Sequence, residues 1–581
     1  MKQLTKLGML LAFGGVLASC SNDKLDNPTT PEVSKGTTYA AFNIAMPSQT
    51  GTKADPTLDD GEESEYSVKG GKVILFKEVG ANEDNYEYVT EGDFIKHAWE
   101  LDGPNNDQIT TTSKTAIAEF TNFILPSDDN STYYALVILN PNKLTLPEEG
   151  DSFGAWRKKA QTTETINTLH GLPTGNNGMV MTNAPEYKEG VFTTLVKIDK
   201  SKVSTTSSTN LSPAAEIYVQ RVASKVTILR GDNTSWDNSA LFNVEYPAGV
   251  SDEDTPKPTK DQVEFSNWAL DYTNNYTYPV QIADMSGNHS DGNWVKEWQK
   301  NNSNATFFST GTFGRVYWAL DPNYTETKVQ TEGGDDDDDE SYDDLFHITE
   351  VTSDLTDNLY CLENTMEYDQ MLRINTTSFV LKGTYYVGGK GQKDKGDSFI
   401  SYGSYRQALD ESFLGDNMTI KASASKKNIS LTDLFELTET GKKTYLSYIK
   451  GETVSDIKDW KDEDNEKAIK YLAKFTENKE IDFYKDGVVY YAMPIRHFTD
   501  DETPKPKPME SVGSYGKVHR GRYGMVRNNW YEIVIGKITG LGDPEVPTPD
   551  PEDPDDPSDK QYMDITIHIL AWAKRSHTYD L

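Results

Sequence analysis

The chain has 581 residues, more than one hydrophobic core usually serves, so two or three packed units are expected. Apolar residues make up 36% and charged residues 26%, with 42 Gly and 26 Pro, which excludes a coiled coil or a wholly disordered chain and favours a loop-rich globular protein. The 92 acidic and 57 basic side chains leave a net charge of −35, which repels phosphate backbones and excludes nucleic acid as an expected partner.

The first twenty residues, MKQLTKLGMLLAFGGVLASC, predict a bacterial export signal. They have a basic start, an apolar core over 7–17 that is too short to span a membrane, and a small-residue cleavage site. The last four residues, 17–20, resemble a lipobox, which implies cleavage before Cys20 and acylation of its thiol; an ordinary secretory signal is the alternative. Acyl chains anchor a protein with about 0.8 kcal/mol per buried methylene. With Cys20 lipidated, Cys361 is the only other thiol and no internal disulfide can form.

A polar stretch to about residue 35 reads as a flexible spacer, and the segment TTYAAFNIAMP after it predicts a strand. Pro47 ends this strand, and a long acidic loop follows it. The apolar side chains on one face of the strand are Ala40, Phe42, Ile44 and Met46.

Further β-type runs follow, each bounded by Gly, Pro, Asn or Asp. They are KVILFKE, YYALVIL, GMVMT, TTLVKI, EIYVQRVASKVTILR, SFVLKGTYYV, GVVYYAMPI and WYEIVIGKI. Helical periodicity is sparse, with candidates at 461–475 and 404–413. The predicted fold class is therefore mainly β, with β-sandwiches and small helical insertions. The Ser/Thr-rich segment Lys202–Pro213 is the expected boundary between two domains.

Motifs for catalysis or metal binding are weak, so no enzyme activity and no cofactor are expected. The eight histidines are scattered, and GDSF at 150–153 and 396–399 lies among loops, whereas an esterase nucleophile follows a strand. The acidic run Asp335–Asp339 lacks the ligand spacing of a calcium loop, so a solvated loop is favoured over a cation site. Aromatic residues, at 11%, favour packed sheet faces over sugar-stacking platforms.

The C-terminus combines a tether with a strand. From Asp543 to Gln561 the chain is dominated by Pro, Asp and Glu, which predicts an extended linker of roughly 60 Å at about 3.1 Å per residue. After it, alternating residues predict a strand that must pair with its own sheet or with another molecule. We interpret it as a donor strand for a neighbouring subunit, and folding back on its own domain is the alternative. The predicted donor residues are Met563, Ile565, Ile567, Ile569 and Trp572.

The order of several motifs, together with the lipobox, resembles the Mfa-like (minor fimbrium) fimbrillins of anaerobic Gram-negative bacteria, subunits of type V pili. The matching motifs are VQRVASKV (219–226), NWALDYTN (267–274), RVYWALDPNY (315–324), YCLENT (360–365), YYAMPIRHF (490–498), VRNNWYEI with KITGLG (526–542) and ILAWAKRSHTYDL (569–581).

The resemblance implies two transthyretin-like β-sandwich domains and export as an outer-membrane lipoprotein. It also implies assembly with other fimbrial subunits into a surface fimbria that adheres to host or bacterial receptors and supports biofilm formation. The domains expected are a signal peptide (1–20), a spacer and removable first strand (21–53), an N-terminal sandwich (54–212), a C-terminal sandwich (213–542) and a linker with the donor strand (543–581).

In the family that the chain resembles, a protease cuts after an arginine beyond the first strand. Here no arginine precedes Arg157, so Lys53 in GTKAD is the expected cut site. The open alternatives are an anchor subunit that keeps its lipid and a lipid-anchored protein that binds glycans. The complete C-terminal strand favours a polymerising shaft subunit.

Overall fold

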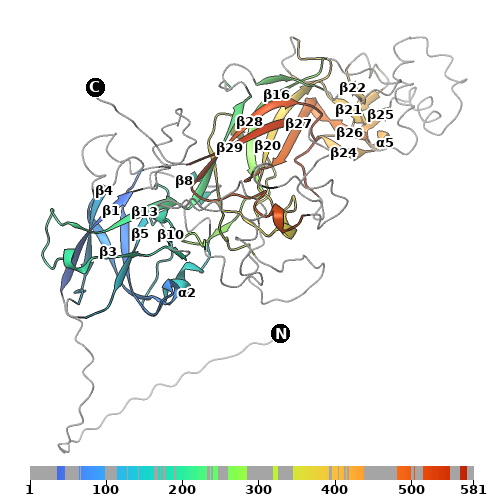
Figure 1. The fold of residues 1–581 in the computed structure, drawn as a ribbon. Coiled ribbons are helices and arrows are strands. Elements are labelled where there is room, and N and C mark those ends of the chain that lie inside the picture. Colours follow the sequence, from blue (N-terminus) through green and yellow to red (C-terminus); the bar gives the residue numbers. More distant parts are fainter. Residues whose placement is uncertain are drawn as a thin grey trace, which may run out of the picture.

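A computed structural model describes a mainly β protein, as the sequence predicts. It describes residues 36–45, 65, 67–97, 114–126, 129–141, 143–162, 168–169, 172–173, 178–188, 191–231, 236, 240–245, 260–283, 318–324, 345–391, 395–402, 405–410, 414, 418–437, 481–498, 503, 515–549 and 563–571. The expected helix at 461–475 and the acidic run Asp335–Asp339 lie outside these residues. Figure 1 shows an elongated arrangement, with β1 to β5 near one end and β21 to β26 at the other.

The first unit is one sheet that folds back on itself. Its strand order is β12 (Val196–Lys197), β5 (Tyr133–Leu139), β2 (Gly71–Lys77), β3 (Glu87–His97), β4 (Lys114–Thr121), β1 (Thr37–Ala45), β13 (Pro213–Arg221) and β9 (Met181–Asn183). Because β9 also pairs with β5, the pairings close into a ring. The apolar run of β2 is buried on both faces: Val73 and Leu75 lie in one core cluster, Ile74 and Phe76 in another.

Several short elements lie outside the ring of strands. They are α2 (Phe153–Arg157), the 3-10 turns η1 (Glu83–Asn85) and η3 (Lys200–Lys202), and the strand pairs β10 (Glu186–Lys188) with β11 (Val191–Thr193), β7 (Thr168–Leu169) with β8 (Leu172–Pro173), and β6 (Gln161–Thr162) with β17 (Tyr276–Thr277). The helix α2 packs Phe153 and Trp156 into the same cluster as Ile74.

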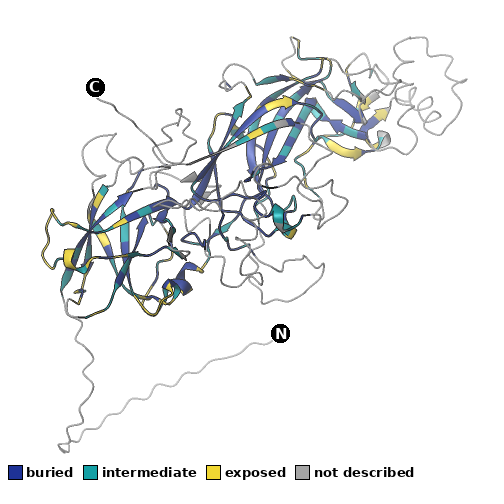
Figure 2. Ribbon diagram, in the orientation of Figure 1, coloured by how far each residue is buried: buried dark blue, intermediate teal, exposed yellow. Residues whose placement is uncertain are grey.

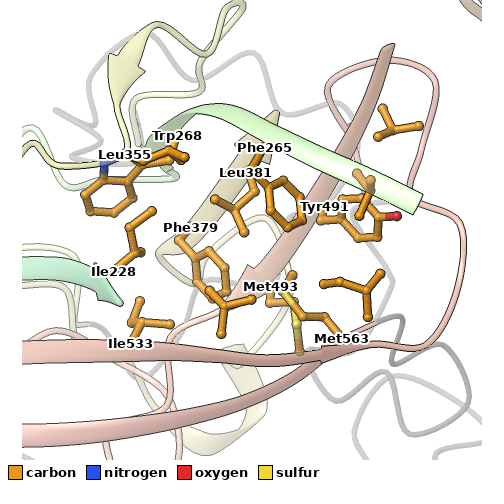
Figure 3. Packing of buried hydrophobic residues seen from close by; sticks show 14 of the residues in the cluster. Ile228, Phe265, Trp268, Leu355, Phe379, Leu381, Tyr491, Met493, Ile533 and Met563 are labelled. Carbon is orange, nitrogen blue, oxygen red and sulfur yellow. The ribbon is translucent and has the colours of Figure 1, made fainter. Parts of the chain in front are cut away.

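The second unit packs two sheets around one core. One sheet has the order β19 (Leu359–Leu362), β14 (Ala223–Arg230), β28 (Asn529–Ile538) and β29 (Met563–Ala571). The other has the order β15 (Leu241–Asn243), β16 (Gln262–Asp271), β20 (Ser378–Tyr386) and β27 (Val488–Pro494), with β18 (Ser353–Asp354) paired to β16. Ile228 and Ile533 of the first sheet share a cluster with Phe265, Trp268 and Phe379 of the second, as Figure 3 shows. Figure 2 shows these strands as largely buried.

Two smaller sheets form a distal insertion between β20 and β27. They contain β22 (Tyr405–Ala408), β21 (Phe399–Tyr402), β26 (Ile481–Tyr484) and β24 (Lys426–Ile429), and β23 (Met418–Ile420) with β25 (Phe435–Leu437), next to α5 (Leu431–Leu434). The remaining 3-10 turns are η5 (Tyr368–Gln370), η8 (Lys485–Gly487) and η9 (Lys517–His519).

One local expectation is wrong, and one predicted β-type run is divided between two sheets. The predicted helix at 404–413 contains strand β22, which pairs antiparallel with β21. The run from Glu216 to Arg230 is two strands in different sheets, β13 and β14, separated by Val222.

The pairing of β13 bears on the expected domain boundary. β13 starts at Pro213, where the second domain is expected to begin, yet it pairs with β1 and β9 of the first unit. We therefore propose the boundary at Val222, where the chain passes from one unit to the other.

Candidate functional site

The first strand lies inside the sheet of the first unit and has neighbours on both edges. β1 pairs antiparallel with β4 from Thr37 to Ile44 and parallel with β13 from Ala41 to Ala45. Both edges of its backbone are therefore hydrogen-bonded. Removal of β1 would leave a slot between β4 and β13 with unpaired groups on each side.

The side chains of β1 fill the core as the alternation predicts. Ala40, Phe42 and Ile44 are at most 2% exposed and lie in one cluster with Phe120 of β4. Fully burying a side chain such as Phe or Ile contributes about 1.5–3 kcal/mol, so the larger two together contribute on the order of 5 kcal/mol.

The last strand has a different environment. β29 pairs antiparallel with β28 of its own chain, with Ile567 opposite Ile533 and Ile569 opposite Tyr531. Met563 is buried in the core of the second unit beside Met493 (Figure 3). Ile565 and Ile567 are partly buried and pack against that core. β29 ends the order of its sheet, and no described strand pairs with its other edge.

A buried ion pair joins the two units just after the acidic loop. Glu65 is 1% exposed, and its carboxylate accepts hydrogen bonds from Lys225 of β14 at 2.8 Å and from the Tyr360 hydroxyl of β19 at 2.5 Å. Arg221 of β13 donates to the Glu65 carbonyl at 2.6 Å. Burial raises the pKa of Glu65, but Lys225, Tyr360 and Arg221 outweigh burial and hold the pKa below its ordinary value.

The Lys225 ammonium also lies 4.4 Å from the centroid of the Trp530 ring. Trp530 and Tyr360 cluster with Met179 of the first unit. Glu65 therefore attaches the segment that precedes β2 to the second unit. We call Glu65, together with its contacts to Lys225, Tyr360 and Arg221, the Glu65 peg.

A second polar network crosses the same junction. Arg527 Nε donates to Glu363 at 2.9 Å, and Gln281 bridges Glu363 to Gln220 of β13 at 3.1 and 2.9 Å. Nearby, Asp321 is buried and accepts from the backbone N–H groups of Thr365 and Asn323. Burial, with the nearby charge of Glu363, raises the pKa of Asp321 to about 7.

The two GDSF segments have structural roles in the described residues. Ser152 caps α2 by accepting from the Ala155 N–H at 3.2 Å, and Ser398 accepts from the Asp486 N–H at 2.9 Å.

Among the scattered histidines, His347 pairs with Asp271 at 2.9 Å and stacks on Tyr272.

Among the described residues, no group of three or more His, Cys, Asp or Glu side chains is arranged to hold a metal ion. Cys361 is buried, and burial raises its thiol pKa, which disfavours a reactive thiolate. In the same part of the chain, no helix is long and apolar enough to cross a membrane.

Several predicted site residues lie outside the described part of the chain. These are the lipidation site Cys20, the cut site Lys53, Met46 of the first strand and Trp572 of the last. The structure places Ala40, Phe42 and Ile44 together in β1, and Met563, Ile565, Ile567 and Ile569 along β29.

Sequence reasoning missed the Glu65 peg. Glu65 ends the acidic run DDGEESE, where nothing in the sequence distinguishes it from its solvated neighbours. The only available signal was the pair of cations, Arg221 and Lys225, within an otherwise apolar strand pattern, because a buried cation needs an acidic partner.

The C-terminal part of the chain matches a family of known proteins. Residues 482–578, which contain β27, β28 and β29, match the profile of the fimbrillin C-terminal region, described as major fimbrial subunit protein type IV. The expected resemblance to fimbrillins is thus confirmed through this part of the chain. No curated protein matches the chain.

Solved structures of low similarity align over most of the chain. A putative cell adhesion protein from Parabacteroides distasonis has 10% identity and a TM-score of 0.36, with 93% of this chain and 98% of that one covered. A fimbrilin from Porphyromonas gingivalis has 13% identity and a TM-score of 0.34, with the same coverage.

Proposed function

We propose that this protein is a structural subunit of a cell-surface fimbria, and that it polymerises by strand exchange after its first strand is removed. β29 of one subunit would occupy the slot left by β1 in the next. The family match supports the fimbrial role, and the environments of β1 and β29 support the exchange.

One observation carries the proposal: β1 has a paired neighbour on each edge, whereas β29 has a described neighbour on only one. A strand that moves from the end of a sheet into a slot gains a second ladder of backbone hydrogen bonds, each worth about 0.5–1.5 kcal/mol net. Both strands have nine residues, so β29 is long enough to span the slot.

The side chains of the two strands are compatible in character. The slot is shaped for Ala40, Phe42 and Ile44, and β29 offers Met563, Ile565 and Ile567 at the same two-residue spacing. Ile569 and Trp572 continue the donor segment. In its own chain the same aliphatic face already packs against a core, with Met563 buried and Ile565 and Ile567 partly buried, so most of it is shielded from water before exchange.

The Glu65 peg supports cleavage in the interval between Ala45, the last residue of β1, and Glu65. Such a cut would separate β1 from the rest of the chain, while the new N-terminal segment stays attached to the second unit through Lys225 and Arg221. Lys53 lies in this interval and is the proposed cut site. Removal of the segment up to Lys53 would also remove the lipid on Cys20.

The partners under this proposal are other fimbrial subunits of the same or related type. The precursor would be an outer-membrane lipoprotein, and the mature form would be part of an extracellular fimbria that serves adhesion and biofilm formation.

Deletion of residues 562–581 tests the exchange. We expect an exported, folded subunit that forms no fibres, measured by electron microscopy and by the ladder of oligomers on a gel. The point variant Ile567→Asp should act in the same way, because it places a charge in an apolar slot, while Thr566→Ala, at an exposed neighbouring position, should assemble normally. Fibres of normal length from the deletion would refute the donor role.

A further inference from the structure

The segment between β28 and β29 is docked where a free linker is expected. β28 ends at Ile538 and β29 begins at Met563, although antiparallel neighbours can be joined by about two to five residues. The described part of this connection is residues 539–549, and ten of these residues, 540–549, are held against the second unit by contacts along their length. We call these ten residues the strap.

The strap is hydrogen-bonded to β27 and to the distal insertion. Asp543 and Tyr490 exchange both backbone N–H···O bonds, each 2.8 Å long. The hydroxyls of Tyr484 and Tyr491 donate to the Gly542 and Gly540 carbonyls at 2.8 and 3.0 Å. These four bonds fix the backbone of Gly540, Gly542 and Asp543.

Side chains hold the strap as well. The Asp543 carboxylate pairs with Lys427 of β24 at 2.9 Å, an interaction that is half-exposed and so contributes little. Pro544 is buried, and Val546 packs on the outer face of the β16–β20–β27 sheet against the cluster that contains Val380 and Ile348. Gly542 allows the close approach, because a Cβ there would lie 2.3 Å from the Tyr490 carbonyl oxygen.

The hydrogen bonds and the ion pair of the strap are with β24, β26 and β27. Its Leu541 lies in the core cluster of the second unit, which also contains Met563 of β29. Because the hydrogen bonds fix the strap backbone without β29, we expect the strap to stay docked when β29 leaves its sheet.

We propose that the strap stays docked and acts as a fixed base when β29 leaves its own sheet. Residues 550–562, and not the whole acidic linker, then limit the distance that β29 can cover. This inference rests on the proposed strand exchange. At about 3.1 Å per residue, these thirteen residues reach roughly 40 Å, against roughly 60 Å for a linker that is free from Asp543. The strap thereby limits how far apart two joined subunits can lie, and the distal insertion positions the donor through Tyr484.

The first test measures amide hydrogen exchange in the monomer. The Asp543 amide should be protected in the full chain and, within about threefold, equally protected after deletion of residues 562–581. Gly542→Ala should abolish this protection, since the added methyl group clashes with Tyr490. An Asp543 amide that becomes unprotected when β29 is deleted would show that the strap depends on the donor strand, and the inference would be wrong.

The second test locks the strap with a disulfide. In the Tyr490→Cys/Asp543→Cys variant the two residues are a hydrogen-bonded pair, for which Cα atoms lie about 5.5 Å apart, within the range of a disulfide. The oxidised variant should form fibres as extensively as the same variant after reduction. If it assembles only when reduced, the strap must detach during exchange, which overturns the inference.

The two tests separate this inference from the proposed function. If the wild-type chain never exchanges strands, the exchange proposal fails, and the monomer measurement still decides whether the strap is a fixed base. If fibres form but the locked variant is excluded from them, strand exchange stands and only the fixed base is lost.

Discussion

Truncation of Phe42 to alanine should destabilise the precursor and leave the mature subunit unchanged. Phe42 is fully buried at the centre of β1, and substitution of a buried Phe by Ala typically costs about 3–5 kcal/mol. For a unit of this size, 1 kcal/mol corresponds to roughly 2–4 °C in Tm, so the precursor should melt on the order of 10 °C lower.

The matched control is Phe120→Ala. Phe120 of β4 is equally buried in the same cluster, but β4 remains in the subunit after the first strand has been removed. Phe120→Ala should therefore lower the stability of precursor and mature subunit alike.

The assay is thermal and denaturant unfolding of the purified precursor and of subunits isolated from fibres, for the wild type and both variants. Mature subunits from Phe42→Ala and from the wild type should unfold identically, because removal of β1 takes residue 42 out of both proteins. A mature Phe42→Ala subunit that remains less stable than the wild type would show that β1 is still bound, and the reasoning about the slot would fail. An unaffected precursor would instead contradict the packing of Phe42.

Three further predictions concern the junction and the cut site. Lys225→Met should cost about 3–5 kcal/mol, because it leaves the Glu65 carboxylate buried without its cation, and adding Glu65→Gln should recover part of that loss in a double-mutant cycle measured by urea unfolding. Asp321 has a pKa raised from 3.8 to about 7 in the folded state. Its contribution to stability is therefore complete below about pH 4 and is lost as the pH rises towards 7. Asp321→Asn should flatten the dependence of Tm on pH over this window. Lys53→Ala should block removal of the first strand, which would appear on a gel as a band at the size of the precursor. Normal processing of this variant would show that the protease cuts at another residue.

The sequence predicted strands best where the apolar run is long and buried on both faces. YYALVIL coincides with β5, and WYEIVIGKI lies within β28, because β-branched and aromatic residues between turn signals leave little ambiguity. The continuous pattern from Glu216 to Arg230 hid the passage between two sheets, since Val222 is buried like its neighbours. Hydrophobicity alone does not record which sheet a strand joins.

The site was predictable only in part. The alternation in β1 and β29 identified the strands and their aliphatic faces, but not that β1 has two neighbours and β29 one, which depends on contacts distant in sequence. The Pro- and Asp-rich composition of the linker predicted an extended chain from Asp543, but it did not predict that Asp543 and Val546 contact the second unit. Val546 and the backbone of Gly542 find their partners in the second unit, and composition does not carry that information.

Within the proposed mechanism, cleavage is the step that sets the direction of assembly. Before cleavage the slot is filled by β1, which is tethered to its own chain and held on both edges, so a neighbour's β29 would have to displace an intramolecular strand. At the same time β29 is stored against β28 with Met563 in the core, which keeps an aggregation-prone strand from exposing its aliphatic face. After cleavage β1 is no longer tethered and can be lost by dilution, whereas every new subunit supplies a β29 that remains covalently attached. The gain of a second ladder then favours the filled slot, and the precursor stays monomeric until it has been processed.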